Sequence, residues 1–257
     1  APLKLVEVRR ALAAGLNRDQ LIDRALNGQG VPLTGPYLPD SWAYDQAIFA
    51  AAGVNGANSS ELLNNAGWVL PEGATVRQSE DESFLLRLLV LDTAVQQRVA
   101  QEVAAQWANL GVEVVVETAV SIADLREKLA ARDFDVALVD ITPSIDPDLY
   151  DFWSQEAIIR GQNYGGWNNR RASEALEAGR QVWGLGERRP YYNTFLNIYA
   201  AQIPAITLYQ HIYTYAVSSE VNRVEIGPVY EPRDRYQTFA NWFLLYRDVT
   251  ISCPPEE

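Results

Sequence analysis

Residues 84–139 alternate short apolar runs with amphipathic segments, and this alternation constrains the fold more than any other feature. Phe84–Leu91 is an apolar run of strand length. Thr93–Asn109 carries valines and a tryptophan at four-residue steps, which predicts a helix with one buried face. Val112–Val116 and Phe134–Val139 are two further apolar runs. Because strands joined through helices pair in parallel, this part of the chain predicts a parallel sheet flanked by helices.

Capping residues predict where two of the helices begin. Asn17 precedes one helix, with Gln20 three residues later and Gly28 at its end. Ser121 precedes another, with Asp124 at the matching position.

The other segments give a coarser pattern. Beyond these, the sequence predicts a helix carrying Val8, Leu12 and Leu16, an ordered loop over Val31–Asp45, a short helix over Glu61–Ala66 ended by Gly67, helices over Ala172–Val182 and Glu187–Ala201, and a strand over Ile206–Tyr209 leading into Tyr213–Val217.

Composition excludes several classes of protein. The net charge is −12 and the chain contains two lysines, Lys4 and Lys128, so the clustered cations that bind nucleic acid are missing. No apolar run reaches the roughly 18 residues of a membrane span. The one cysteine, Cys253, excludes an internal disulfide.

Catalytic and metal-binding motifs are missing from the sequence. It contains no nucleophile elbow, phosphate-binding loop, zinc-protease helix or dinucleotide fingerprint. A zinc site needs three or four ligands, but the only histidine is His211, so we expect no metal and no cofactor. A carboxylate cluster, Asp140, Asp146 and Asp148, leaves a hydrolase as an alternative. Acidic residues beside a proline are more often turn formers.

The segment after the third predicted strand is the candidate binding region. It leaves the carboxyl end of a parallel strand, where open α/β sheets bind ligands, and it begins with Asp140. Several aromatic residues follow, among them Trp153, Tyr164 and Trp167, which suit stacking and hydrogen bonding of a small solute. The alternative is that these rings pack the next helix.

Several segments together resemble one family, the family 5 extracellular solute-binding proteins, which include dipeptide-, oligopeptide- and nickel-binding proteins. Their order and spacing over nearly the whole chain carry the resemblance. The matching segments are Val8–Leu12, Leu16–Ile22, Gly28, Gly35–Pro36, Ser41–Asp45, Leu62–Trp68, Leu110–Val114, Arg132–Asp135, Asp146–Asp148, Glu187–Tyr192 and Ile203–Tyr209.

The resemblance implies a lobe of the type II periplasmic-binding-protein fold, an α/β fold with a mixed, mainly parallel sheet. It implies a receptor that captures a small-molecule or peptide ligand for an ABC permease in the membrane, without being an enzyme. Residues 1–217 would form the C-terminal large lobe. Residues 218–257 would form a return segment that packs on an N-terminal lobe missing from this chain. A sensory receptor lobe of the same fold is the other alternative.

The same resemblance implies a place outside the cytoplasm, periplasmic or extracellular, with anchoring to the cell envelope as an option. Residues 1–4 lack the layout of a secretory signal, so we expect the targeting segment to be absent from this chain.

One departure from the family bears on the solute. Peptide-binding members carry an aspartate three residues before the Asp-Pro-Asp turn, where this chain has Pro143. This difference favours an oligosaccharide or another small polar solute over a peptide as the ligand. Asp140 is a candidate substitute. The predicted ligand-binding residues, drawn from the loop Gly35–Tyr44 and the segment Asp140–Trp167, are Asp140, Trp153, Trp167, Tyr37, Trp42 and Tyr164.

Overall fold

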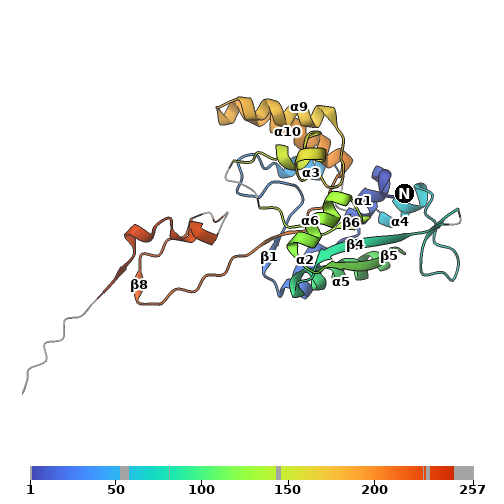
Figure 1. Ribbon diagram of the computed structural model, residues 1–257, viewed down its shortest axis with the longest axis horizontal. Coiled ribbons are helices and arrows are strands. Elements are labelled where there is room, and N and C mark those ends of the chain that lie inside the picture. The colour runs from blue at the N-terminus through green and yellow to red at the C-terminus, as the bar shows by residue number, and fades with distance from the viewer. Residues whose placement is uncertain are drawn as a thin grey trace, which may run out of the picture. The chain divides into compact units, whose positions relative to one another are not determined.

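The computed structural model describes residues 2–52, 58–80, 82–142, 146–227, 229 and 232–245. The chain divides into two compact units, Ala1–Ile212 and Tyr213–Glu257. The helices of the larger unit are α1 (Val6–Ala14), α2 (Arg18–Leu26), α3 (Gln46–Ala51), α4 (Ser59–Asn65), α5 (Ala94–Ala108), α6 (Ile122–Ala131), α7 (Tyr150–Trp153), α8 (Ala157–Arg160), α9 (Arg170–Gln181) and α10 (Leu185–Gln202) (Figure 1). Its strands are β1 (Gly30–Pro32), β2 (Gln78–Ser79), β3 (Glu82–Ser83), β4 (Leu85–Leu91), β5 (Glu113–Ala119), β6 (Val136–Ala137) and β7 (Tyr209–His211).

The central sheet has the order β5-β4-β6 and is parallel throughout, as the alternation of strands and helices predicts. Leu88 of β4 lies opposite Val116 of β5 on one side and Val136 of β6 on the other. The ladder of β6 is shorter than the predicted strand Phe134–Val139. Backbone bonds continue at both of its ends, because Asp135 donates to Arg87 and Leu138 donates to Leu89.

One face of this sheet is buried against α1, α2 and α5. Leu86, Leu88 and Val90 point into the same core as Val99 and Trp107 of α5. On the opposite face Leu89 and Ala119 pack with Leu129 of α6. The apolar stripe of α5 is therefore explained, since Val99, Val103 and Trp107 are buried in this core. Gln96, Glu102 and Gln106 of the same helix are also buried, and each makes a side-chain hydrogen bond.

Side-chain caps fix the helix starts where the sequence predicts them. Asn17 accepts a hydrogen bond from the N–H of Gln20, and Ser121 accepts one from Asp124. Thr93 does the same for Gln96 at the start of α5. Each bond satisfies an N–H that the first turn of a helix leaves without a partner.

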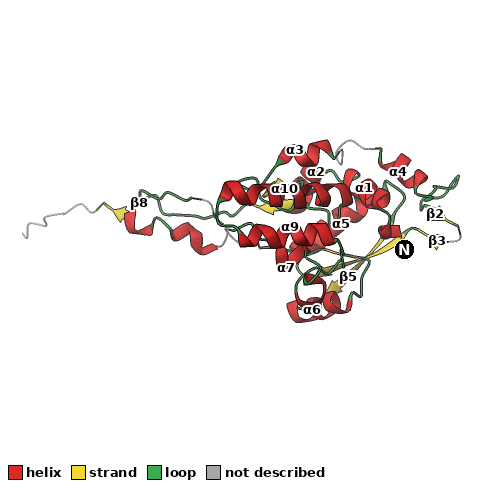
Figure 2. Ribbon diagram, turned by 90° about the horizontal axis from the view of Figure 1, so that it is seen from above, coloured by secondary structure: helices red, strands yellow, loops and turns green. Residues whose placement is uncertain are grey.

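A second layer is built from α9 and α10, which lie side by side as a hairpin (Figure 2). Its core is a cluster of buried side chains that includes many rings. This aromatic core comprises Tyr37, Ala43, Phe49, Leu149, Trp153, Ala172, Ala175, Leu176, Tyr192, Phe195, Leu196, Tyr199 and Ala200.

The predicted strands near the end of the larger unit are only partly correct. β7 starts at Tyr209 rather than at residue 206 and pairs antiparallel with β1, so a short antiparallel pair accompanies the parallel sheet. The pairing continues past Pro32, because Leu33 donates to the carbonyl of Leu208. The continuation over residues 213–217 is wrong, because these residues form no strand.

The smaller unit begins at Tyr213, whereas the sequence led us to expect a boundary after residue 217. Ile212 still donates to the carbonyl of Gln29, which extends the β1–β7 pairing to the end of the larger unit. In the smaller unit β8 (Val221–Asn222) pairs antiparallel with β9 (Phe243–Leu244). Two 3-10 turns, Pro232–Tyr236 and Phe239–Asn241, lie between them.

An aromatic cluster organises this smaller unit. The guanidinium of Arg235 lies 4.4 Å from the ring centre of Tyr236 and donates to the hydroxyl of Tyr213. Phe239 and Trp242 add ring contacts on Tyr236. Large apolar side chains stay exposed around the cluster, with Phe239 64% and Leu245 77% exposed. Cys253 lies outside the described residues.

Candidate functional site

The carboxyl edge of the parallel sheet carries a carboxylate held in a fixed position. Asp140 follows β6 and is exposed. The buried Gln96, in the first turn of α5, donates from Nε2 to Asp140 Oδ2 at 2.9 Å. Its Oε1 accepts from the N–H of Leu91 at 2.8 Å. One amide therefore links the end of β4 to the segment that leaves β6.

Tyr209 of β7 adds a phenol to this edge. Burial, together with the negative charge of Asp140, raises the pKa of the Tyr209 hydroxyl to about 12, so the phenol stays protonated at physiological pH. Among the described residues no lysine, arginine or histidine forms an ion pair with Asp140. The edge can therefore offer hydrogen-bond acceptors and a negative charge to a polar molecule.

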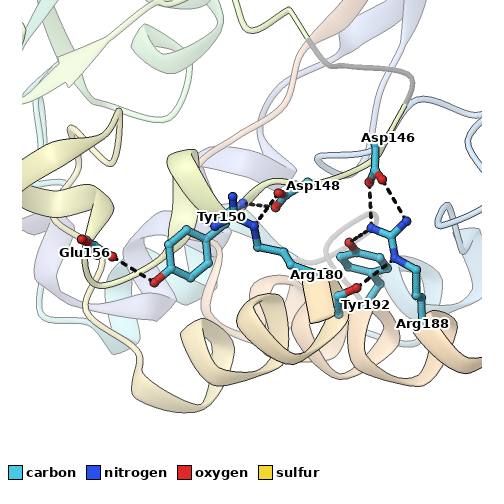
Figure 3. Close-up of polar contacts among 8 residues, drawn as sticks. Asp146, Asp148, Tyr150, Glu156, Arg180, Arg188 and Tyr192 are labelled. Atoms are coloured by element: carbon cyan, nitrogen blue, oxygen red, sulfur yellow. Dashed lines mark hydrogen bonds and ion pairs between the residues drawn. The ribbon is translucent and has the colours of Figure 1, made fainter. Parts of the chain in front are cut away.

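The turn that follows is fastened to α10 by an arginine. Asp146 accepts two hydrogen bonds from Arg188, at 2.8 and 2.9 Å, in a bidentate pair (Figure 3). The side chain of Arg188 is 10% exposed and that of Asp146 is 53% exposed. This paired geometry is the strongest form of arginine–carboxylate contact.

A second pair fastens the same turn to α9. Asp148 Oδ2 lies 2.7 Å from Arg180 Nε, and Asp148 Oδ1 accepts a hydrogen bond at 3.0 Å from the N–H of Tyr150, the first residue of α7. Arg180 also lies over the Tyr150 ring, 4.6 Å from its centre, and Tyr150 donates to Glu156 (Figure 3). The Asp-Pro-Asp carboxylates are thus occupied in holding the turn in place. Pro143 lies outside the described residues.

Four of the predicted aromatic residues come together in or against the aromatic core. Tyr37 is 2% and Trp153 is 9% exposed, and neither the Tyr37 hydroxyl nor the Trp153 indole N–H has a partner among the described residues. Trp153 packs edge-on against Trp167 and Tyr199, at centroid distances of 6.3 and 5.1 Å. These two side chains serve packing here, and their contact with solute stays a prediction.

Trp42 and Trp167 are only partly buried at the margin of the same core. Trp167 Nε1 donates to Gln202 Oε1 at 2.7 Å. Trp42 packs edge-on against Tyr192, with ring centres 5.3 Å apart, and Arg188 lies 5.2 Å from its ring centre.

The remaining predicted residue, Tyr164, lies elsewhere. It packs against the core of Leu89, Ala119 and Leu129, and its carbonyl accepts from Arg132. The structure therefore groups Tyr37, Trp42, Trp153 and Trp167, and it leaves Asp140 and Tyr164 outside that group.

Sequence reasoning missed Gln96, Arg180 and Arg188, which hold the candidate site together. The sequence nevertheless contains a chemical signal for the two arginines. Two carboxylates in one turn require positive partners or water, and Arg188 lies in the Glu187–Tyr192 segment that carried part of the resemblance.

The described residues lack two further kinds of feature. No helix there combines the length and the apolar character needed to cross a bilayer. No group of three or more His, Cys, Asp or Glu side chains in the described ranges is placed to hold a metal ion.

Residues 1–157 match the family described as bacterial extracellular solute-binding proteins, family 5 Middle. The chain belongs to this family. Among curated family 5 relatives, the oligopeptide-binding protein AppA of Bacillus subtilis is 25% identical over 245 residues, which cover 93% of this chain and 44% of AppA.

Solved family 5 structures show the same fold. AppA in complex with a nonapeptide aligns with a TM-score of 0.75 at 22% identity, covering 95% of this chain and 48% of AppA. The mannohexaose-bound periplasmic oligopeptide-binding protein of Thermotoga maritima aligns at 0.73, with 16% identity and coverage of 86% and 44%. DppA of Helicobacter pylori, in complex with the peptide STSA, aligns at 0.71, with 21% identity and coverage of 94% and 44%. The predicted type II periplasmic-binding-protein fold is confirmed, and the chain spans less than half the length of these relatives.

Proposed function

We propose that this chain is one lobe of a two-lobed solute receptor that delivers its ligand to an ABC permease. The observation that carries the proposal is the exposed Asp140 carboxylate, held by Gln96 at the carboxyl edge of a parallel sheet. Ligands of open α/β sheets bind at that edge. Membership of family 5 supports the same role, because the relatives compared above are named as binding proteins.

The solute class that fits this edge is a small polar molecule rich in hydrogen-bond donors, either a short peptide or an oligosaccharide. Both classes occur among the structural neighbours, as the STSA peptide and as mannohexaose. Asp140 offers acceptor oxygens to an ammonium or to sugar hydroxyl groups, and a donor from the solute would offset the cost of taking the carboxylate out of water.

The hydrolase alternative receives no support from the geometry, because Arg188 and Arg180 occupy Asp146 and Asp148. No observation favours the sensory alternative. We infer that the protein works without catalysis, and that the missing lobe supplies the other half of the binding cleft, as expected of receptors that close around a ligand.

We further propose that the smaller unit, or residues 218–257 within it, packs on the missing lobe. The exposed Phe239 and Leu245 support this, since apolar side chains gathered on one small unit favour burial against a partner surface. The receptor would function in the periplasm or outside the cell, where a permease can receive the solute.

Calorimetric titration of the full-length two-lobed protein with STSA peptide and with mannohexaose tests the proposal. We expect one of the two probes to bind with 1:1 stoichiometry. Asp140→Asn should weaken that binding about tenfold or more, because it removes the charge from the strongest acceptor at the edge. The matched control is Asp23→Asn, an exposed aspartate on α2. The absence of binding by both probes, combined with a native mass spectrum free of any co-purified solute, would refute the proposal.

A further inference from the structure

Arg188 of α10 contacts three other segments of the larger unit with one side chain. Nε donates to the carbonyl of Gly179 at 2.9 Å, near the end of α9. The two terminal nitrogens bind Asp146, and one of them also donates to the hydroxyl of Tyr192. The guanidinium lies 5.2 Å from the ring centre of Trp42. The α9–α10 hairpin, the Asp-Pro-Asp turn and the loop of residues 33–45 therefore meet at a single group.

Two of these segments are the ones predicted to face solute. The turn with Asp146 belongs to Asp140–Trp167, and Trp42 belongs to Gly35–Tyr44. The hydrogen bonds around Trp42 are short-range, from Ser41 to Leu38 and from Tyr44 to Ser41. The Trp42 side chain, which packs on Tyr192 and Arg188, thus links this end of the loop to α10.

The guanidinium is suited to hold both segments at once. It is planar, so it can bind a carboxylate along its edge and present its face to an aromatic ring. Its bonds to Asp146 raise the pKa of Arg188, which keeps the group charged despite burial. A lysine has a single point of charge and cannot make these contacts together.

Arg180 shows what an arginine does here without that second contact. It binds Asp148 of the same turn and covers Tyr150, and its side chain is 42% exposed. Both of these contacts lie within residues 148–150, and neither involves Trp42. It provides a matched comparison on the neighbouring helix.

We propose that Arg188 is a positioning residue that couples the loop of residues 33–45 to the segment of residues 146–153, which contains the Asp-Pro-Asp turn and α7. It would set solute affinity without contacting solute. The coupling is a property of the lobe alone, whereas its effect on affinity rests on the proposed function. Because one buried group contacts both segments, a change in either segment should be transmitted to the other.

Hydrogen–deuterium exchange of the full-length protein tests the coupling by perturbing one segment and measuring the other. We expect Asp146→Asn to speed exchange in residues 37–44, and Trp42→Ala to speed exchange in residues 146–153, each about tenfold. Arg188→Gln should speed both, and Arg180→Gln only the second. Even if Arg188→Gln fails to fold, the two reciprocal variants still decide the question. Effects confined to the substituted segment would overturn the coupling.

Titration with STSA peptide and mannohexaose then tests the effect on affinity. With a wild-type protein that binds one probe, we expect Arg188→Lys to weaken that binding about tenfold. Arg170→Lys, at an exposed arginine of α9 paired with Glu174 outside the candidate site, should change it less than about twofold. Equal affinities for the two variants would overturn the positioning role. Failure of the wild type to bind either probe would count against the proposed function and would leave the exchange result intact.

Discussion

Asn163 and Trp167 exchange two hydrogen bonds: the side-chain amide of Asn163 donates to the Trp167 carbonyl at 2.8 Å, and the Trp167 N–H donates back at 3.0 Å. The amide also donates to the carbonyl of Ser154 at 3.1 Å. Asn163 is 2% exposed, so one buried side chain provides hydrogen-bond partners for the backbone of Ser154 and Trp167 around the loop after α8. This arrangement gives the segment that carries Trp153 and Trp167 a fixed shape.

Asn163→Ala should therefore lower the free energy of unfolding by about 2–3 kcal/mol, since it leaves buried backbone groups without partners. Urea unfolding followed by tryptophan fluorescence measures this change. Asn197→Ala serves as the control, because among the described residues its exposed amide donates only to Asn193, one turn earlier. This substitution should change stability by less than about 1 kcal/mol. Similar values for the two variants would contradict the role given to Asn163.

Gln96→Ala should lower the free energy of unfolding by about 1–3 kcal/mol, because the Leu91 N–H and Asp140 both lose a partner. Gln97→Ala is the neighbouring control, as Gln97 donates to the exposed Asp92. It should cost less than about 0.5 kcal/mol. Chemical unfolding of both variants checks the difference, and a loss in Gln97→Ala as large as in Gln96→Ala would contradict it.

Two glycines should respond with opposite sign to alanine. A Cβ on Gly161 would lie 2.4 Å from the carbonyl oxygen of Asp151, so Gly161→Ala should destabilise by about 1–3 kcal/mol. A Cβ on Gly186, in α10, meets nothing within 4 Å. Gly186→Ala should therefore stabilise by about 0.5 kcal/mol through lower backbone entropy of the unfolded chain. Thermal unfolding of the two variants measures the change in stability of each. A change of the same sign in both would contradict this prediction.

Stability should fall as pH rises from about 10 to about 12, in part because of Tyr209. Its folded-state pKa is raised to about 12 by burial and by Asp140, so the folded protein keeps a proton that the unfolded chain loses. This contribution to the free energy of unfolding is fully present below the pKa of about 10 that tyrosine has in the unfolded chain. It is lost as the pH rises toward the folded-state pKa of about 12. Unfolding of Tyr209→Phe between these pH values should show a shallower decline than the wild type. An identical decline would show that Tyr209 contributes nothing.

Local patterns in the sequence were sufficient for the central sheet and the helix starts. The strand-length apolar runs, the four-residue steps of Val95, Val99 and Val103, and the caps at Asn17 and Ser121 all lie within a few residues of the element they define. Hydrophobic period and capping are set by near neighbours, so these features survive without knowledge of the rest of the chain. Connection rules then give the parallel pairing of β4, β5 and β6.

Only the tertiary structure decided what the aromatic and acidic residues of the candidate site do. Tyr37 is buried because it meets Tyr192 and Phe195, more than 150 positions away in the numbering of the chain. Asp146 holds its turn because Arg188 reaches it from α10. The sequence alone does not distinguish a tryptophan that stacks on a solute from one that packs in a core. Burial and ion pairing depend on which distant segments fold against a side chain, so the division between support and recognition at this site belongs to the packed molecule.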